Sequence, residues 1–425
     1  MNATSVVSHR MDGVGGHVRS AVKIAWTNLA VLATLLIGIE CLAFGYYVAR
    51  HALAGYDQVR DYVKTQVAKM PLDGYPNPQD QSWFRAYWEE FNKSTYAAVQ
   101  SVSYSNWHRY PFTGRYINVD HVGRRATWNQ DPEDVPGVIR VGIFGGSTVW
   151  GTGARDEFTI PSYISKMLAE RHPHRFHVIN YGQDGYVTTQ EVVTLLREIQ
   201  RNSFPDIVVF YDGYNESFTA FQRGAAGFPM NEDNRMREFN ILHPSRARDF
   251  YVEVLSRTNT FQLIQGVRRA VRPEAVADPL QDRNNETLAQ DALRVYFRNV
   301  EFVSVMEKQF AFAAQFFWQP SVYTRARPTK QEVSMIHASD EHALLYRKIH
   351  EAMKRVDRAS HPANFRDISN VLDGYGGTAF IDTVHATELV NEVVAREIVA
   401  GLADTLKARP SRAAVVHSVR TAARQ

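Results

Sequence analysis

Four short segments of the chain combine residue types that could perform nucleophilic chemistry. A serine follows two glycines in Gly145-Gly146-Ser147-Thr148, and a histidine stands three residues after an aspartate in Asp382-Thr383-Val384-His385. Two further segments, ending at Gly185 and Asn215, could supply hydrogen-bond donors. A serine is a weak nucleophile until a base accepts its proton, and a histidine with a near-neutral pKa is suited to that role. The pattern predicts acyl transfer through Ser147.

The other residues of the set fit the remaining tasks of such a reaction. Asp382 can accept a hydrogen bond from the second imidazole nitrogen of His385 and so fix its tautomer. The tetrahedral intermediate needs donors aimed at its negative oxygen. We expect these donors to be the backbone N–H groups of Ser147 and Gly185 and the side-chain amide of Asn215.

Other uses of the glycine-rich turn before Ser147 fail on spacing. A phosphate-binding loop of the Walker type needs a lysine, which the turn lacks. The glycines at 142, 145, 146 and 151 do not have the spacing of a dinucleotide fingerprint. The nucleophile elbow of α/β-hydrolases requires glycine where Val149 stands.

The elements that must position these residues are apolar, β-rich runs that alternate with helical patterns. Continuous apolar strands of this kind form parallel sheets that helices cover on both faces. The fold class is therefore α/β, doubly wound and flavodoxin-like, with three α/β/α layers. In such sheets ligands bind at the carboxyl ends of the strands, where the four segments stand. The strands are expected at 138–144, 176–180, 206–211, 316–323 and 378–382.

The four blocks in this order resemble the SGNH family, the GDSL-type esterases and acyltransferases. The resemblance covers about 105–406, and it implies the triad Ser147, Asp382 and His385 with the oxyanion donors named above. Three positions depart from the family pattern, Gly146, Glu216 and Val390, and none removes a catalytic atom. Gly-Gly-Ser-Thr variants with an N-terminal membrane helix resemble the branch found in bacterial envelope and exopolysaccharide systems.

Composition limits the alternatives. The 425 residues are 44% hydrophobic and 22% charged, with a net charge of +3, and the mean hydropathy of -0.33 excludes a polytopic membrane protein. The near-neutral charge gives no argument for nucleic-acid binding. Cys41 is the only cysteine, so no internal disulfide forms, and the cluster of His172, His174 and His177 is read as a solvated turn. We expect no metal and no cofactor.

One segment predicts a membrane anchor. Residues 24–49 carry a single charge, Glu40, and are long enough to cross a bilayer. A cleaved signal peptide ending near Ala54 is the rival, but Arg50 and a tyrosine pair stand where its short polar region belongs. The tail 1–23 is expected in the cytoplasm and the large domain in the periplasm. Glu40 is either a functional intramembrane acid or a partner in helix packing.

The rest of the chain divides around the predicted hydrolase-like domain, 105–406. Residues 50–104 are expected to form a helical stem, and 81–130 hold twelve aromatic residues that either pack this extension onto the domain or bind sugar. The polar insertion at 217–285 could lie over the strand ends as a lid. Residues 407–425 form a basic tail that we expect to be disordered.

The resemblance and the anchor together imply a function. We expect a serine-dependent esterase that removes O-acyl groups, most simply O-acetyl, from an envelope or secreted polysaccharide. An O-acetyltransferase would use the same triad, and a non-catalytic glycan-binding or assembly subunit would keep only the fold. Expected partners are an acylated polysaccharide or oligosaccharide, the membrane and an exopolysaccharide-synthesis complex, with no nucleic acid.

Overall fold

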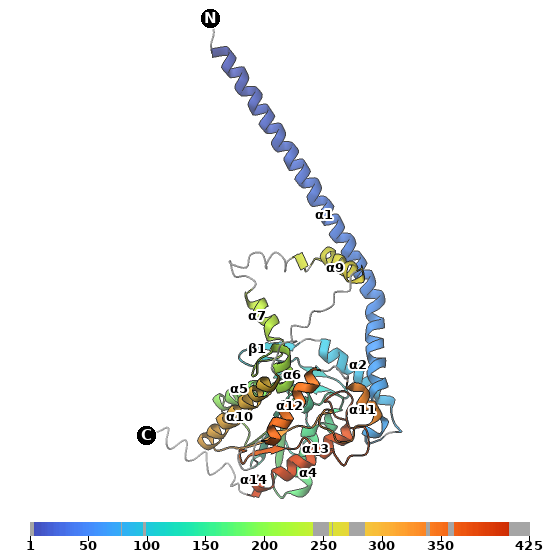
Figure 1. Ribbon diagram of the computed structural model, residues 1–425, viewed down its shortest axis with the longest axis vertical. Coiled ribbons are helices and arrows are strands. Elements are labelled where there is room, and N and C mark those ends of the chain that lie inside the picture. The colour runs from blue at the N-terminus through green and yellow to red at the C-terminus, as the bar shows by residue number, and fades with distance from the viewer. Residues whose placement is uncertain are drawn as a thin grey trace, which may run out of the picture. The chain divides into compact units, whose positions relative to one another are not determined.

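The computed structural model describes residues 4–77, 79–96, 99–240, 255–256, 258–271, 285–336, 341–355 and 361–407. It divides into two compact units, one of residues 1–60 with 236–278 and one of residues 61–235 with 279–425. We describe each unit by itself (Figure 1).

The larger unit is built on a five-stranded parallel sheet. Its strand order, β6-β5-β7-β8-β9, places the first strand of the sheet between the second and the third, as in flavodoxin-like folds. This arrangement confirms the predicted doubly wound α/β class. The strands are β5 (Ile139–Gly145), β6 (Phe176–Asn180), β7 (Ile207–Asp212), β8 (Ala313–Trp318) and β9 (Phe365–Asp367).

Helices cover both faces of this sheet because alternate strand residues point to opposite sides. Val141 and Ile143 face a core that contains α4 (Ile160–Arg171) and α13 (Glu388–Gly401). Phe144 faces the other core. That second core holds residues of α5 (Thr188–Gln200), α10 (Asn285–Phe310) and α12 (Glu341–Arg355) (Figure 1).

Short helices complete the larger unit, most of them in the connections between strands and covering helices. They are α3 (Ser147–Trp150), η2 (Asp156–Phe158), α6 (Tyr214–Arg223), α11 (Lys330–Met335) and α14 (Ala403–Lys407). The predicted basic tail beyond α14 lies outside the described residues.

The fifth strand is not where the sequence predicted it. The apolar run 378–382 forms a buried loop with one isolated bridge, between Phe380 and Ala386. Its N–H groups bond elsewhere: Ala379 donates to Glu332 Oε1 and Ile381 donates to the carbonyl of His385. The edge of the sheet is occupied instead by the three residues of β9, a strand too short to stand out by its pattern. Burial of Phe380 and Ile381 therefore reflects a packed loop, because apolar side chains alone do not distinguish the two.

The N-terminal extension packs onto this domain through its aromatic residues. Most of these rings, among them Trp83, Tyr87 and Trp88, form one buried cluster with Trp150 and Ile381 of the domain. Packing is thus the main role of the aromatic region, as one of the two interpretations expected. Its elements are η1 (Leu72–Gly74), α2 (Ser82–Tyr96), β1 (Val99–Val102), β2 (Asn106–Arg109), β3 (Phe112–Thr113) and β4 (Asn118–Val119).

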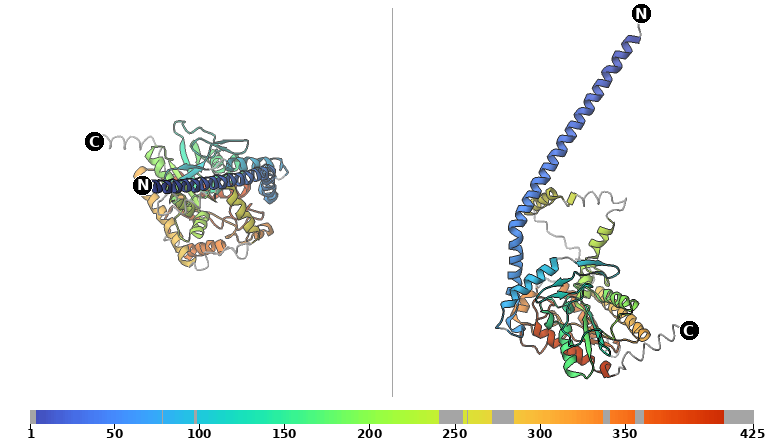
Figure 2. Two further views of the ribbon diagram at one scale, coloured as in Figure 1. Left: turned by 90° about the horizontal axis from the view of Figure 1, so that it is seen from above. Right: turned by 180° about the vertical axis from the view of Figure 1, so that it is seen from behind.

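The smaller unit contains most of one long helix, α1 (Thr4–Lys69), which is continuous in Figure 2. Its segment Val22–Tyr46 is long and apolar enough to cross a membrane, or to be a signal sequence, and only 6% of that window is buried. The unit also holds α9 (Asn259–Val271) and the last part of α7 (Glu232–Asn240).

Candidate active site

Two strands of the sheet end at the predicted nucleophile and at one predicted oxyanion donor. β5 ends at Gly145, and Ser147 is the first residue of the short helix α3. β7 ends at Asp212, and Asn215 lies in the first turn of α6. In the sheet, β6 and β7 lie on opposite sides of β5. The carboxyl end of β5 is therefore the topological switch point, where such folds bind ligands.

Ser147, His385 and Asp382 form a hydrogen-bonded chain. His385 Nε2 lies 2.7 Å from Ser147 Oγ, and His385 Nδ1 lies 2.6 Å from Asp382 Oδ2. The other oxygen of Asp382 accepts the backbone N–H groups of Val384 and His385 at 2.9 and 2.8 Å, which fixes the carboxylate in place. Residues 238 positions apart thus meet with the geometry that a nucleophile and its base require.

The charges around His385 favour its protonated form. Burial lowers the pKa of the imidazole, but the charge and the hydrogen bond of Asp382 raise it, and the nearby carboxylate of Asp184 adds to the rise; the net shift is upward. Desolvation raises the pKa of Asp382, but the imidazole and three hydrogen bonds outweigh that effect and hold it below its usual range. Asp382 therefore stays ionised while His385 exchanges its proton.

The three predicted oxyanion donors come from three different turns. Within the described residues, the N–H groups of Ser147 and Gly185 donate to no protein acceptor. The first of these is open because it belongs to the first turn of a helix. One proton of the Asn215 amide donates to the carbonyl of Tyr186 at 2.8 Å, which ties the amide to the loop that carries Gly185.

The glycine at 146 has a local explanation. A Cβ at this position would lie 2.2 Å from Nδ2 of Asn215. Its φ of -82° is open to any residue, so the requirement comes from space and not from backbone conformation. The amide of Asn215 occupies the volume that a side chain at 146 would need.

The long side chain of Glu216 explains why glutamate stands at this position, because it reaches both Gly213 and Thr188. Its Oε2 accepts the N–H of Gly213 at 2.9 Å. Its Oε1 accepts both the N–H and the hydroxyl of Thr188, at 2.7 and 2.6 Å. The longer side chain therefore caps α6 and joins its start to the start of α5, which stabilises the turn that carries Asn215.

Two more carboxyl groups are buried below this turn. Glu191 is fully buried and Asp212 is 4% exposed. Burial raises the pKa of each group well above its ordinary value, and the neighbouring carboxylates raise it further. Both groups therefore hold their protons more tightly than exposed carboxyl groups do. Asp212 is the last residue of β7, directly before the turn that carries Asn215.

A hairpin of the N-terminal extension braces the loop that carries Gly185. Trp107 Nε1 donates to the carbonyl of Asp184 at 2.9 Å, and the Arg109 N–H donates to Gln183 Oε1 at 3.0 Å. The Arg109 guanidinium forms an ion pair with Asp184. The sequence analysis did not identify Trp107 or Arg109 as part of the site; its only signal was the density of aromatic residues in 81–130.

The start of the predicted insertion also approaches this loop. A Cβ at Gly185 would lie 2.6 Å from Cε of Met230, and the φ of +68° at Gly185 is one that side chains rarely adopt. The guanidinium of Arg235 lies 4.9 Å from the ring of Trp107. Residues 241–254, on which a lid over the site would depend, lie outside the described residues.

Two residues at the end of β8 take supporting positions. Gln319 Oε1 accepts the hydroxyl of Thr148 at 3.1 Å. Trp318 packs under Gly213, where a Cβ would lie 2.7 Å from its ring. His177 lies near the amino end of β6, away from Ser147, and its Nδ1 is 2.8 Å from the carbonyl of Asp131.

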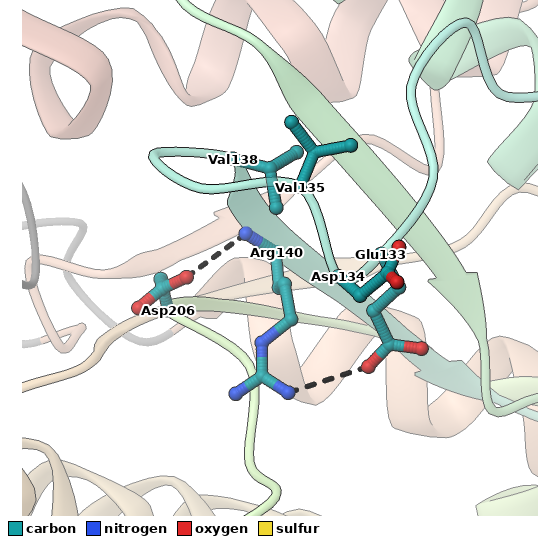
Figure 3. A pocket seen from close by; sticks show the side chains of 6 residues that line it. All are labelled: Glu133, Asp134, Val135, Val138, Arg140 and Asp206. Atoms are coloured by element: carbon teal, nitrogen blue, oxygen red, sulfur yellow. Dashed lines mark hydrogen bonds and ion pairs between the residues drawn. The ribbon is translucent and has the colours of Figure 1, made fainter.

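A separate pocket of about 430 Å³ lies at the opposite end of the strands, where they begin (Figure 3). Arg140 binds two of the three carboxylates that line it. The backbone N–H of Arg140 donates to Asp206 at 2.9 Å, and its guanidinium reaches Glu133 at 3.3 Å and the carbonyls of Ser203 and Phe204. This pocket lies at the amino ends of β5 and β7 and takes no part in the hydrogen-bonded chain at Ser147.

Comparisons with known proteins give only distant likenesses. No family model and no curated protein sequence matches the chain. An acetyl xylan esterase, AlAXEase, is 12% identical with a TM-score of 0.33, and the match covers 62% of this chain and 100% of that one. A member of the lipolytic protein G-D-S-L family from Veillonella parvula DSM 2008 has the same identity and TM-score, over 62% and 97%. The lipase/acylhydrolase from Enterococcus faecalis is 13% identical with a TM-score of 0.28, over 61% and 95%. Likeness at this level carries no argument about activity, which must rest on the side chains of this chain.

Proposed function

We propose that the protein is a membrane-anchored serine esterase that removes small acyl groups, most simply acetyl, from the hydroxyls of an envelope or secreted polysaccharide. The single observation that carries this proposal is the chain of hydrogen bonds from Asp382 through His385 to Ser147, at 2.6 and 2.7 Å. Such a chain converts a serine hydroxyl into a nucleophile for esters.

The reaction runs in two halves. Ser147 Oγ attacks the ester carbonyl and its proton passes to His385 Nε2, while the negative oxygen of the intermediate receives hydrogen bonds from Ser147 N–H, Gly185 N–H and Asn215. Collapse of the intermediate breaks the bond to the sugar oxygen, which takes the proton from His385 and leaves an acyl-Ser147 ester. Water then repeats the cycle, losing a proton to His385, and releases the carboxylic acid and the free serine.

The proposed site of action rests on the anchor. With the segment Val22–Tyr46 as the membrane span, we place the N-terminal side in the cytoplasm and the catalytic domain in the periplasm, at the inner membrane. Retention of the helix is supported by Glu40, which accepts four hydrogen bonds from Asn259 and Thr260. Cleavage near Ala54 would remove Glu40 and break all four.

Hydrolysis of p-nitrophenyl acetate by the full chain in detergent tests the proposal. We expect turnover that is lost in Ser147→Ala with an unchanged melting temperature, and an acetyl group on the Ser147 peptide when the wild-type reaction is quenched early. An added oligosaccharide acceptor should not become acetylated. Acetyl transfer to the sugar would make the protein an acetyltransferase, and undiminished turnover in Ser147→Ala would exclude Ser147 as the nucleophile.

A further inference from the structure

The smaller unit joins α9 to α1 through a half-buried set of hydrogen bonds that the proposed esterase reaction does not use. Glu40 Oε1 accepts the backbone N–H and the side-chain amide of Asn259, at 2.7 and 2.9 Å. Glu40 Oε2 accepts the backbone N–H and the hydroxyl of Thr260, at 3.0 and 2.8 Å. Both oxygens of the carboxylate are thereby satisfied, and so are two N–H groups in the first turn of α9. Both views of the ribbon show α9 beside α1 (Figures 1 and 2).

The contact lies within the segment that could cross a membrane. Glu40 precedes Tyr46, the last residue of the span, by six positions. At a rise of about 1.5 Å per residue, this places the carboxylate about 9 Å below the end of the span. In hydrocarbon a carboxylate and the open N–H groups of a helix end are both costly, and here each satisfies the other. Glu40 thus serves as a helix-packing partner, one of the two roles expected for it.

α9 exposes three large apolar side chains on one side. Leu263, Ile264 and Val267 are 36%, 58% and 58% exposed, and their spacing of three and four residues places them on one side of the helix. Leu255, just before the helix, is 56% exposed. An apolar face of this kind is costly in water and favourable in lipid.

We propose that α9 is a second membrane-embedded segment. It lies in the leaflet that contains the C-terminal end of the span, with its apolar face against lipid acyl chains. The inference rests on the proposed anchor, because the depth of α9 follows from that of Glu40. Thirteen residues reach about 20 Å, too short to cross a core of about 30 Å, so α9 enters one leaflet only.

We assign the apolar face to lipid because the first turn of α9 is hydrogen-bonded to Glu40, inside the proposed membrane span. The side chains of the span face lipid in that proposal, and among them Leu36 is 58% exposed, as is Ile264 on α9. The insertion that carries α9 therefore belongs, in this part, to the membrane attachment.

Depth-dependent quenching in vesicles tests the inference. The full chain with Cys41→Ala carries a single cysteine at Leu36, Ile264 or Val305, labelled with the fluorophore NBD and reconstituted into phosphatidylethanolamine–phosphatidylglycerol vesicles with acyl-chain doxyl lipids. Val305, on α10, is 67% exposed and serves as the water-facing control. We expect strong and comparable quenching at 36 and 264 and none at 305.

The outcomes separate the two proposals. Quenching at 36 without quenching at 264 would overturn the embedding of α9 and leave the anchor intact. Absence of quenching at both positions would overturn the anchor and the inference with it. A blue-shifted but unquenched probe at 264 would mean that a second copy of the chain covers the face, which also overturns the inference.

A second set of variants tests the role of Glu40. Glu40→Ala removes the acceptor and should reduce quenching at 264 several-fold while leaving that at 36 unchanged. Glu40→Gln keeps one acceptor oxygen and should fall between the two. Thr34→Ala is the control, because Thr34 bonds only within α1, to the carbonyl of Ala30. Unchanged quenching at 264 in Glu40→Ala would contradict docking through this carboxylate.

Discussion

The two ends of the same parallel sheet treat their polar groups in opposite ways. At the amino ends, the guanidinium of Arg140 is bound by Glu133 and by two backbone carbonyls, beside a pocket of about 430 Å³. At the carboxyl ends, two backbone N–H groups stay open among the described residues, next to a serine whose hydroxyl lies 2.7 Å from a histidine. The guanidinium at the amino ends is already bound, whereas these donors at the carboxyl ends are open.

This difference indicates that the carboxyl ends of the strands are the end of the sheet suited to catalysis. A reaction needs donors and a nucleophile that converge on one point without first binding each other. In the pocket at the amino ends, by contrast, the guanidinium of Arg140 is already bound by Glu133, Ser203 and Phe204.

The largest effect should come from removing the base. His385→Gln leaves Ser147 without a proton acceptor, so we expect kcat for p-nitrophenyl acetate to fall by roughly 10⁴-fold or more. The melting temperature should change little, because the side chain is partly exposed. Measured turnover within tenfold of wild type would remove His385 from the mechanism.

The next largest effect should come from an oxyanion donor. Asn215→Ala should lower kcat by roughly 10²- to 10³-fold, about 3 to 4 kcal/mol of transition-state stabilisation, with little change in KM. Steady-state kinetics of the two parameters checks this. A change confined to KM would show that the amide binds substrate and does not act on the intermediate.

A smaller loss is expected from a methyl group placed beside that donor. Gly146→Ala would set a Cβ 2.2 Å from Nδ2 of Asn215, so the amide must move. We expect kcat to fall by up to roughly 10²-fold, the scale of an ångström's misplacement. The double variant Gly146→Ala/Asn215→Ala should have a kcat no lower than that of Asn215→Ala alone. Additive losses of kcat would show that Gly146→Ala does not act through the amide of Asn215.

A shift in pH dependence should follow from Asp184→Asn. The Asp184 carboxylate helps to raise the pKa of His385, so its removal lowers that pKa. The imidazole must be neutral to accept the proton, so kcat/KM rises with pH through this pKa, and the acidic limb should move to lower pH. Asp131→Asn, whose carboxylate pairs with Arg175, serves as the control. An acidic limb that stays in place, or moves to higher pH, would contradict the assignment.

The smallest effect on activity should come from the other end of the sheet. Arg140→Ala removes hydrogen bonds to Glu133, Ser203 and Phe204, so we expect unfolding in denaturant to become easier by about 1–3 kcal/mol. Turnover under native conditions should stay within twofold of wild type. A loss of activity as large as that of Asn215→Ala would break the contrast between the two ends.

Much of the fold could be predicted because its strands are buried on both faces. The runs at 176–180 and 206–211 match β6 and β7 within one residue. β9 could not be found this way, since three residues at an edge leave no periodic signal, and the apolar loop at 378–382 has the composition of a strand.

The candidate site, like the fold, was only partly predictable from the sequence. Ser147, Asp382 and His385 stand in local turns, so their types and spacing in the sequence were informative. The contacts of Trp107 and Arg109 with the Gly185 loop could not be predicted from the sequence. They join residues more than 70 positions apart, through one backbone carbonyl and one glutamine side chain. Contacts of this kind depend on tertiary packing and leave no pattern in either segment.

The ion pair between Arg155 and Glu388 has a consequence for synthesis of the chain. It joins positions 233 residues apart, and the guanidinium of Arg155 covers the ring of Trp83 at 4.0 Å. Until the ribosome has passed codon 388, this ring and its aromatic neighbours lack part of their cover. A nascent chain, or one truncated before α13, therefore leaves part of this aromatic surface open to aggregation, and the folding of α13 completes its cover.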